Sequence, residues 1–278
     1  MMRLVGAAAF ALIAGSATGT AHEFWISPET YRWAPGTAVL ADLQVGDAFD
    51  GTVQGFVPQD FTRFEILTED GVIEVEGHAG DVPALGGLEL REGLAVIVYE
   101  TAARQLTWEG WDRFAAYADT KGLGDLTAVR AERGLMSASP PREEYTRFAK
   151  SLVAIGHGAG ADRLVGLRTE FVALANPYTD DLAGALPVQL YLDGDPCSMA
   201  RVNVFARPSG GGEIEMSVHE TDSNGIVILP IEPGTEYLVT SVMLEPTAEA
   251  PDAAPDDGVW RTLWASMTFE VPRPETSP

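Results

Sequence analysis

The sequence has little cysteine and little positive charge. Cys197 is the only cysteine, so no disulfide can form within the chain and a packed apolar core must supply its stability. Lysine and arginine together number 18 against 41 aspartates and glutamates, which gives a formal net charge of −23. Because nucleic acids and anionic membrane surfaces reward basic patches, we expect neither as a partner.

Long apolar runs are missing beyond the first residues. The run 4–14 follows the single cation Arg3 and precedes small residues, which is the layout of a secretory signal peptide. We therefore expect residues 1–21 to be a signal peptide, cut before His22, although a cut after Ala17 fits the small-residue pattern nearly as well. No later stretch is long and apolar enough to cross a bilayer. The sequence thus predicts a periplasmic or secreted chain with no membrane span.

Common catalytic signatures are also missing. The sequence contains no Gly-x-Ser-x-Gly elbow, no His-Glu-x-x-His and no Walker-type phosphate loop. Paired carboxylates are too plentiful in so acidic a chain to indicate a catalytic pair. We therefore predict no enzymatic activity and no organic cofactor.

Short β-type runs separated by turn residues dominate both ends of the chain. Between residues 37 and 101 they predict a β-sandwich or barrel, with an Asp-Gly hairpin at Thr68–Val72. From residue 167 onward, their spacing predicts an antiparallel sandwich of the Ig-like or transthyretin-like type. The fold class is therefore mainly β.

Between residues 108 and 155 the spacing of apolar residues changes from a strand period to a helical period. Two segments end at Gly122 and Gly134, which are typical helix stops. A third segment, 142–155, places apolar residues on one helical face, which predicts another helix: Tyr145, Phe148, Leu152 and Ile155. We expect a helical insertion over about 108–155.

Two domains follow from this order of elements. The N-terminal β domain with its helical insertion is predicted over residues 22–163, and the C-terminal sandwich over residues 164–278. The stretch 246–259 is Pro, Ala and Asp with almost nothing to bury, so a flexible acidic loop is expected there.

Several segments in one order resemble a known family. They are "AHEFWISP" at Ala21, "GHAGDVPA" at Gly77, "FAAYADTKGL" at Phe114, "FVALANPY" at Phe171 and "LWASMTFEV" at Leu263. Together they resemble a family of exported bacterial domains of unknown function that is grouped with the NikM-type periplasmic component of nickel/cobalt uptake systems. The resemblance implies an exported two-part β protein with a transition-metal role. The chain departs from the uptake component in having no histidine at the third position after the expected cut.

A candidate metal site begins at His22. If the cut falls before it, the α-amine and imidazole Nδ1 of one residue can chelate a metal, and two nitrogens favour Cu(II) or Ni(II). The remaining histidines, His78, His157 and His219, are the candidate further ligands. Ordinary imidazole roles in loops and strands are the alternative for all four.

Three other features allow a functional and a plain interpretation. Cys197 is a reactive thiol, a metal ligand or, as we favour, a partly buried residue. The segment "TDSNG" from Thr221 resembles the start of a calcium loop, but Pro233 stands where the bidentate Glu should be, so a tight turn is favoured. The basic and phenolic cluster within 142–150 is a salt-bridged face, an anion site or a brace between domains, and we favour the brace.

The sequence therefore predicts binding of a divalent transition metal (nickel, cobalt or copper) in the periplasm, for uptake, delivery or buffering. A membrane metal-uptake component is the expected partner. The alternative is an accessory module that binds a partner protein or glycan without metal, marked by exposed aromatics such as Trp108, Trp111 and Trp260. A copper oxidase that uses the His22 amine is the third hypothesis.

Overall fold

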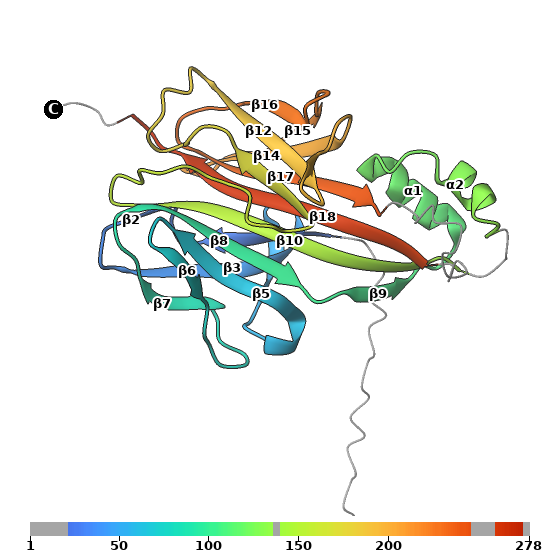
Figure 1. The fold of residues 1–278 in the computed structure, drawn as a ribbon, viewed down its shortest axis with the longest axis horizontal. Helices are drawn as coiled ribbons and strands as arrows, with labels where there is room; N and C mark the ends of the chain where they lie inside the picture. Colours follow the sequence, from blue (N-terminus) through green and yellow to red (C-terminus); the bar gives the residue numbers. More distant parts are fainter. Residues whose placement is uncertain (1–21, 136–139, 246–258, 275–278) are drawn as a thin grey trace, which may run out of the picture.

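The computed structural model describes residues 22–135, 140–245 and 259–274 (Figure 1). The expected signal peptide and most of the expected acidic loop lie outside the described residues. The first half of the chain contains β1 (Glu23–Pro28), β2 (Arg32–Trp33), β3 (Ala38–Asp47), β4 (Asp50–Gln54), a 3-10 turn (Pro58–Asp60), β5 (Phe61–Thr68), β6 (Gly71–Glu74), β7 (Leu85–Glu89), β8 (Gly93–Thr101) and β9 (Arg104–Thr107).

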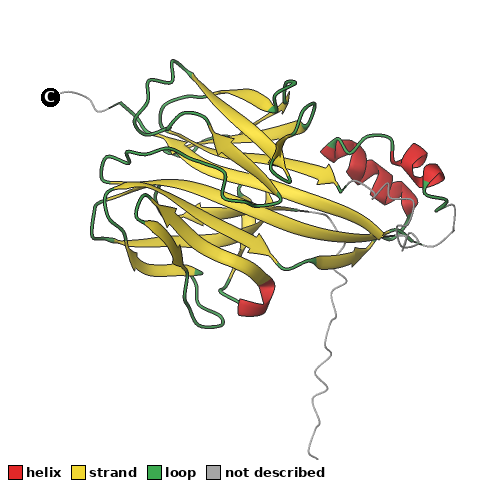
Figure 2. Cartoon of the chain, in the orientation of Figure 1, coloured by secondary structure: helices red, strands yellow, loops and turns green. Residues whose placement is uncertain are grey.

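The second half adds two helices and nine strands, and Figure 2 shows how far strands outweigh helices. These elements are α1 (Trp111–Lys121), α2 (Leu126–Glu132), β10 (Arg142–Ile155), β11 (Thr169–Ala173), β12 (Ala185–Leu192), β13 (Asp195–Pro196), β14 (Arg201–Pro208), β15 (Glu215–Glu220), β16 (Ile226–Pro230), β17 (Thr235–Leu244) and β18 (Val259–Val271). The predicted mainly β fold class is confirmed. Among the described residues, no helix has the length and apolar character that crossing a membrane requires.

One large sheet joins both halves of the chain. Its strand order is β15-β14-β17-β18-β10-β8-β5-β6, with β2 and β9 also paired to β10. The parallel pair β10 and β18 aligns residues 142–151 with 259–268, and Figure 1 shows these long strands crossing the molecule side by side. The boundary predicted near residue 163 stays a prediction, but the strands on either side of it share this sheet.

Two smaller sheets pack on the large one. The first has the order β1-β3-β4 with β7 on β3, and the second has the order β11-β12-β13 with β16 on β12. On β8, Val96 packs in one apolar cluster with Leu190 of β12, whereas Ile97 packs in another with Leu43 of β3. Successive side chains of a strand point to opposite faces, so the two small sheets cover opposite faces of the large sheet.

The helix predicted over 142–155 is wrong, because this segment is strand β10. Residues 148–155 are all buried, since apolar clusters cover both faces of the strand. The sequence of a strand that is buried on both faces does not alternate between apolar and polar residues. The apolar residues of β10 also match a helical period by chance, and periodicity alone cannot distinguish a buried strand from a buried helix.

The rest of the helical insertion is confirmed. Helix α1 ends at Gly122, which has a left-handed φ of 71°, and α2 begins at Asp125, whose Oδ1 accepts hydrogen bonds from the N–H groups of Thr127 and Ala128. The hairpin predicted at Thr68–Val72 is also confirmed, because Thr68 pairs with Gly71 across the turn between β5 and β6.

Candidate functional site

His22 lies beside the turn between β3 and β4. The antiparallel ladder of β1 and β3 aligns Glu23 with Gly46, so the next pair outward is His22 and Asp47. His22 Nδ1 lies 2.8 Å from Asp47 Oδ2. The structure therefore brings the first predicted ligand together with a carboxylate that the sequence analysis did not select.

The turn that presents Asp47 has an unusual backbone. Asp47 pairs with Asp50, which leaves Ala48 and Phe49 as a two-residue loop with φ values of 48° and 64°. Left-handed conformations are uncommon for residues other than glycine and carry strain. The Phe49 ring packs edge-on against Trp25, with ring centroids 6.2 Å apart. Tertiary packing therefore holds the loop, and with it Asp47, in place.

Glu23 is the buried carboxyl of this site. Its side chain is 3% exposed, and Oε1 lies 2.5 Å from Nζ of Lys121 at the end of α1. Lys121 also lies over the Trp264 ring, 5.0 Å from its centroid. The helical insertion thus supplies the cation that neutralises Glu23.

The two neighbouring carboxyls have opposite pKa shifts. Burial raises the pKa of Glu23, and the ion pair with Lys121 offsets this only in part. Burial also acts to raise the pKa of Asp47, but hydrogen bonds from Glu23 and His22 outweigh it and leave that pKa below its usual value. Of the two carboxyls, the one with the lowered pKa is therefore Asp47, and it is the one that faces the imidazole.

Arg147 fixes the backbone of the same residue. Its Nη2 donates a hydrogen bond to the His22 carbonyl oxygen at 2.9 Å. The guanidinium lies over two aromatic rings, 4.8 Å from the Tyr145 centroid and 5.8 Å from that of Trp264. Burial lowers the pKa of Arg147, and nearby Tyr145 counters it. Arg147 therefore anchors residue 22 from β10, on the large sheet.

The other three predicted ligands have separate partners. His78 is 96% exposed with Nδ1 3.6 Å from Asp81, and His157 is 93% exposed with Nε2 3.9 Å from Glu92. His219 is on β15, where Nε2 lies 2.8 Å from Ser217 Oγ. Across the described ranges, no group of three or more His, Cys, Asp or Glu side chains is arranged to hold a metal ion. As ligands, these three histidines stay predictions, and the structure does not bring them to His22.

The structure also locates the tryptophans of the alternative function, and it shows the surroundings of Cys197 and of the turn at Asp222. Trp108 and Trp260 are buried, at 6% and 2% exposure, so they are not the exposed aromatics expected of an interaction module. Cys197 is half-buried with Sγ 3.3 Å from Met243 Sδ, and burial raises the pKa of its thiol. Asp222 Oδ1 accepts the N–H groups of residues 224 and 226, which makes the predicted tight turn.

Sequence reasoning missed most of this site. The basic cluster within 142–150 was noted, but as one face of a helix, whereas strand β10 sends Arg147 to His22 and Lys150 to the opposite face. Glu23 and Asp47 carried no signal, because acidic residues are plentiful throughout the chain. Asp47 could have been chosen only if the pairing of β1 with β3 had been predicted, because that pairing places it opposite His22.

The fold is mainly β, and the matched region defines a family of domains of unknown function. A family model described as a domain of unknown function (DUF4198) matches residues 19–245, and the chain belongs to this family. A comparison with curated proteins found no match.

Three solved structures are distantly similar to this chain. Trypsin-activated α2-macroglobulin from Escherichia coli is 12% identical over 91% of this chain, with a TM-score of 0.23, and the chain spans 16% of that protein. A tetra-tandem repeat of a large adhesion protein is 12% identical over 90% of this chain and 50% of its own, with a TM-score of 0.22. The D0-D1 domain of Intimin is 14% identical over 89% of this chain and 97% of its own, at 0.19. At these TM-scores the similarity carries no functional argument.

Proposed function

We propose that the chain, once it begins at His22, binds one divalent transition metal through that residue's α-amine, its imidazole Nδ1 and the carboxylate of Asp47. The observation that carries the proposal is the 2.8 Å separation of Nδ1 and Oδ2. Neighbouring ligands of a tetragonal metal with bonds of about 2.0 Å lie about 2.8 Å apart, so little movement separates the hydrogen bond from a coordinated pair.

The electrostatics support the same site. Asp47 is the carboxyl whose pKa is lowered, so it is an anion where a cation would bind. Glu23 already forms an ion pair with Lys121, which limits the negative charge of the site. This second carboxyl therefore supports the site and is not proposed as a ligand. Two nitrogens and one oxygen from a compact site favour Cu(II) or Ni(II), since the general affinity order places Co(II) below Ni(II) and Zn(II) below Cu(II).

Residue 22 is also held before a metal arrives. Arg147 binds its carbonyl oxygen, and Glu23 is fixed in the ladder with β3. A preorganised chelate loses less conformational freedom on binding. The resemblance to the NikM-type component supports a role in uptake, delivery or buffering of the metal, with a membrane uptake component as partner.

Metal titration of a chain that begins at His22 tests the proposal. We expect Cu(II) or Ni(II) binding by calorimetry, with a visible d–d band. One extra glycine before His22 should abolish it, since the amine then moves away, and Asp47→Asn should weaken it about tenfold or more. Asp50→Asn, in the same turn, is the matched control and should bind normally. Equal binding by the extended and authentic chains would refute the amine chelate.

An accessory binding module is the second candidate. It is supported by β15, which stands at the end of the large sheet and exposes Met216 and Val218, at 55% and 48%. An exposed edge strand with apolar side chains can accept a strand from a partner protein. Protection of β15 amides from hydrogen exchange by a partner, in a chain that binds no metal, would favour this function over the metal site.

A further inference from the structure

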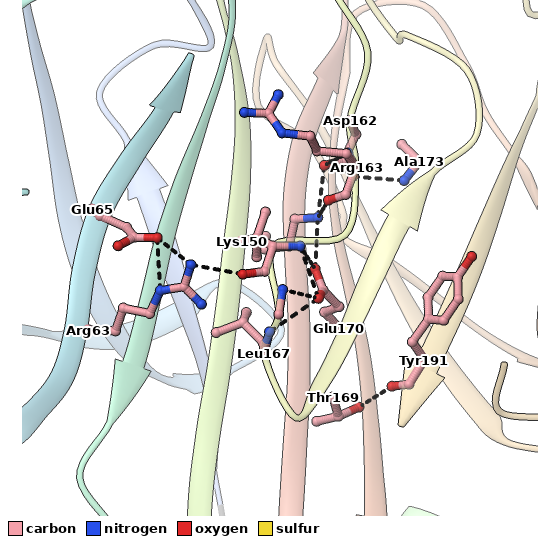
Figure 3. A network of polar contacts seen from close by, with 12 residues as sticks. Arg63, Glu65, Lys150, Asp162, Arg163, Leu167, Thr169, Glu170, Ala173 and Tyr191 are labelled. Atoms are coloured by element: carbon pink, nitrogen blue, oxygen red, sulfur yellow. Dashed lines mark hydrogen bonds and ion pairs between the residues drawn. The ribbon is translucent and has the colours of Figure 1, made fainter. Parts of the chain in front are cut away.

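A buried lysine lies between two buried carboxylates on the opposite face of β10. Lys150 Nζ lies 2.8 Å from Asp162 Oδ1 and 3.4 Å from Glu170 Oε2, and these three side chains are at most 1% exposed. Figure 3 shows Lys150 reaching from β10 toward Glu170 and the loop that carries Asp162. Three ionisable groups with no access to water are unusual in a core.

Apolar residues surround the cluster. Phe148 and Leu152, two positions to either side of Lys150, point to the same face and belong to the core between the large sheet and β12. An ion pair in such a place loses its hydration, and its attraction repays that loss only in part. Conversion of one charged pair into a neutral group would remove this penalty.

We propose that Lys150 and Asp162 join covalently, through an amide between Nζ and Cγ, in a reaction that the chain catalyses itself. Nζ contacts an oxygen that is bonded directly to the carbon it would attack. Reacting groups held in contact in a fixed geometry gain a large rate advantage over the same groups in solution. The product is an isopeptide cross-link from β10 to the loop before β11.

The reaction balances without an oxidant or a cofactor. The Nζ lone pair forms the new bond to Cγ, and one C–O bond of Asp162 breaks with its electron pair remaining on oxygen. The ammonium group of Lys150 gives up two protons, and both leave with that oxygen as one water molecule. The net charge of the three groups is −1 before and after the reaction, because Glu170 remains ionised.

Glu170 is positioned to relay a proton. One carboxylate oxygen faces Nζ, and the carboxylate accepts hydrogen bonds from the backbone N–H groups of residues 165, 166 and 167. It can take one proton from Lys150 and pass it to the departing oxygen. These backbone donors then hold the carboxylate in the core after the lysine charge has disappeared.

The surroundings of Asp162 suit the attacked carboxyl. Its Oδ2 accepts a hydrogen bond from Ala173 N–H at 2.9 Å, and Oδ1 accepts one from Arg163 N–H at 2.8 Å. Backbone donors aimed at carboxyl oxygens stabilise the negative charge that develops there when a nucleophile adds. Arg163 also contributes its carbonyl oxygen, which accepts from Nζ at 3.0 Å and orients the amine.

Tryptic digestion of the purified full chain tests the proposal. Trypsin cannot cut after an acylated lysine, so we expect a single peptide of residues 148–163, lighter than its sequence mass by one water. Fragmentation should show a ring closed between residues 150 and 162. A wild-type digest that is cut after Lys150, with both peptides at their sequence masses, would overturn the cross-link.

Two variants separate the role of Glu170 as proton relay from that of Lys150 as nucleophile. Glu170→Gln keeps the shape of the side chain but not the proton relay, and it should restore cutting after Lys150 in most molecules. Lys150→Arg keeps the charge without a nucleophilic amine, and its intact mass should show no loss of water. Glu65→Gln, which removes a half-buried partner of Arg63, is the matched control and should retain the cross-link. Circular dichroism confirms that each variant is folded, and a cross-link in Glu170→Gln would overturn the role of Glu170.

Discussion

Replacement of Lys121 by methionine is the sharpest test of how the helical insertion supports the site. The substitution keeps most of the apolar side chain and removes the ammonium that lies 2.5 Å from Glu23 Oε1. Glu23 is 3% exposed, so water cannot replace the lost partner. We therefore expect Lys121→Met to destabilise the whole protein and not only α1.

The magnitude follows from the burial of the pair. Loss of one partner from a buried ion pair costs about 3–5 kcal/mol, whereas an exposed pair contributes about 0–1 kcal/mol. Glu23 keeps a backbone hydrogen bond and can take up a proton, since its pKa is already raised. We therefore expect a loss of about 2–4 kcal/mol in the free energy of unfolding near neutral pH.

The loss should depend on pH in a defined direction. A carboxyl whose pKa is raised in the folded state favours folding below its unfolded pKa, and that contribution disappears as the pH rises through the folded pKa. Without Lys121 the folded pKa of Glu23 rises further. The deficit of Lys121→Met should therefore be larger at about pH 7 than at about pH 4, where Glu23 is protonated in both proteins.

Urea unfolding of four proteins provides the assay: the wild type, Lys121→Met, Glu23→Gln and the double variant. In the double variant no buried charge is left unpaired, so it should recover most of the loss, with a coupling energy of about 2 kcal/mol. A deficit below about 1 kcal/mol that does not change with pH would refute the buried pair and indicate a solvated one.

Three further changes test other parts of the fold by denaturant unfolding. Burial raises the pKa of Glu143, so Glu143→Gln should gain stability relative to wild type as the pH rises above the unfolded pKa, and a parallel pH profile would contradict this. Phe171 is fully buried between two sheets, and Phe171→Ala should cost about 3–5 kcal/mol. Asp125→Ala removes the cap of α2 and should cost about 0.5–2 kcal/mol, with faster amide exchange confined to that helix.

Local signals in the sequence predicted much of the fold. The hairpin at Thr68–Val72 and the helix stop at Gly122 follow from turn chemistry and a left-handed backbone, which depend on few neighbours. Strand β10 could not be recognised in the same way, because its character comes from the two layers that cover it. The parallel pairing of residues 142–151 with 259–268 joins distant parts of the chain, and no local pattern predicts it.

The candidate site shows the same division between local and distant information. His22 was selected because of the residues next to it, and the structure gives it a partner that only the pairing of β1 and β3 could supply. A search for clustered histidines leads away from this site, since His78 and His157 are exposed in separate loops. An acidic chain offers many carboxylates, and the tertiary fold selects Asp47 among them by placing it opposite residue 22. The test of a metal site in this protein therefore depends more on Asp47→Asn than on any second histidine.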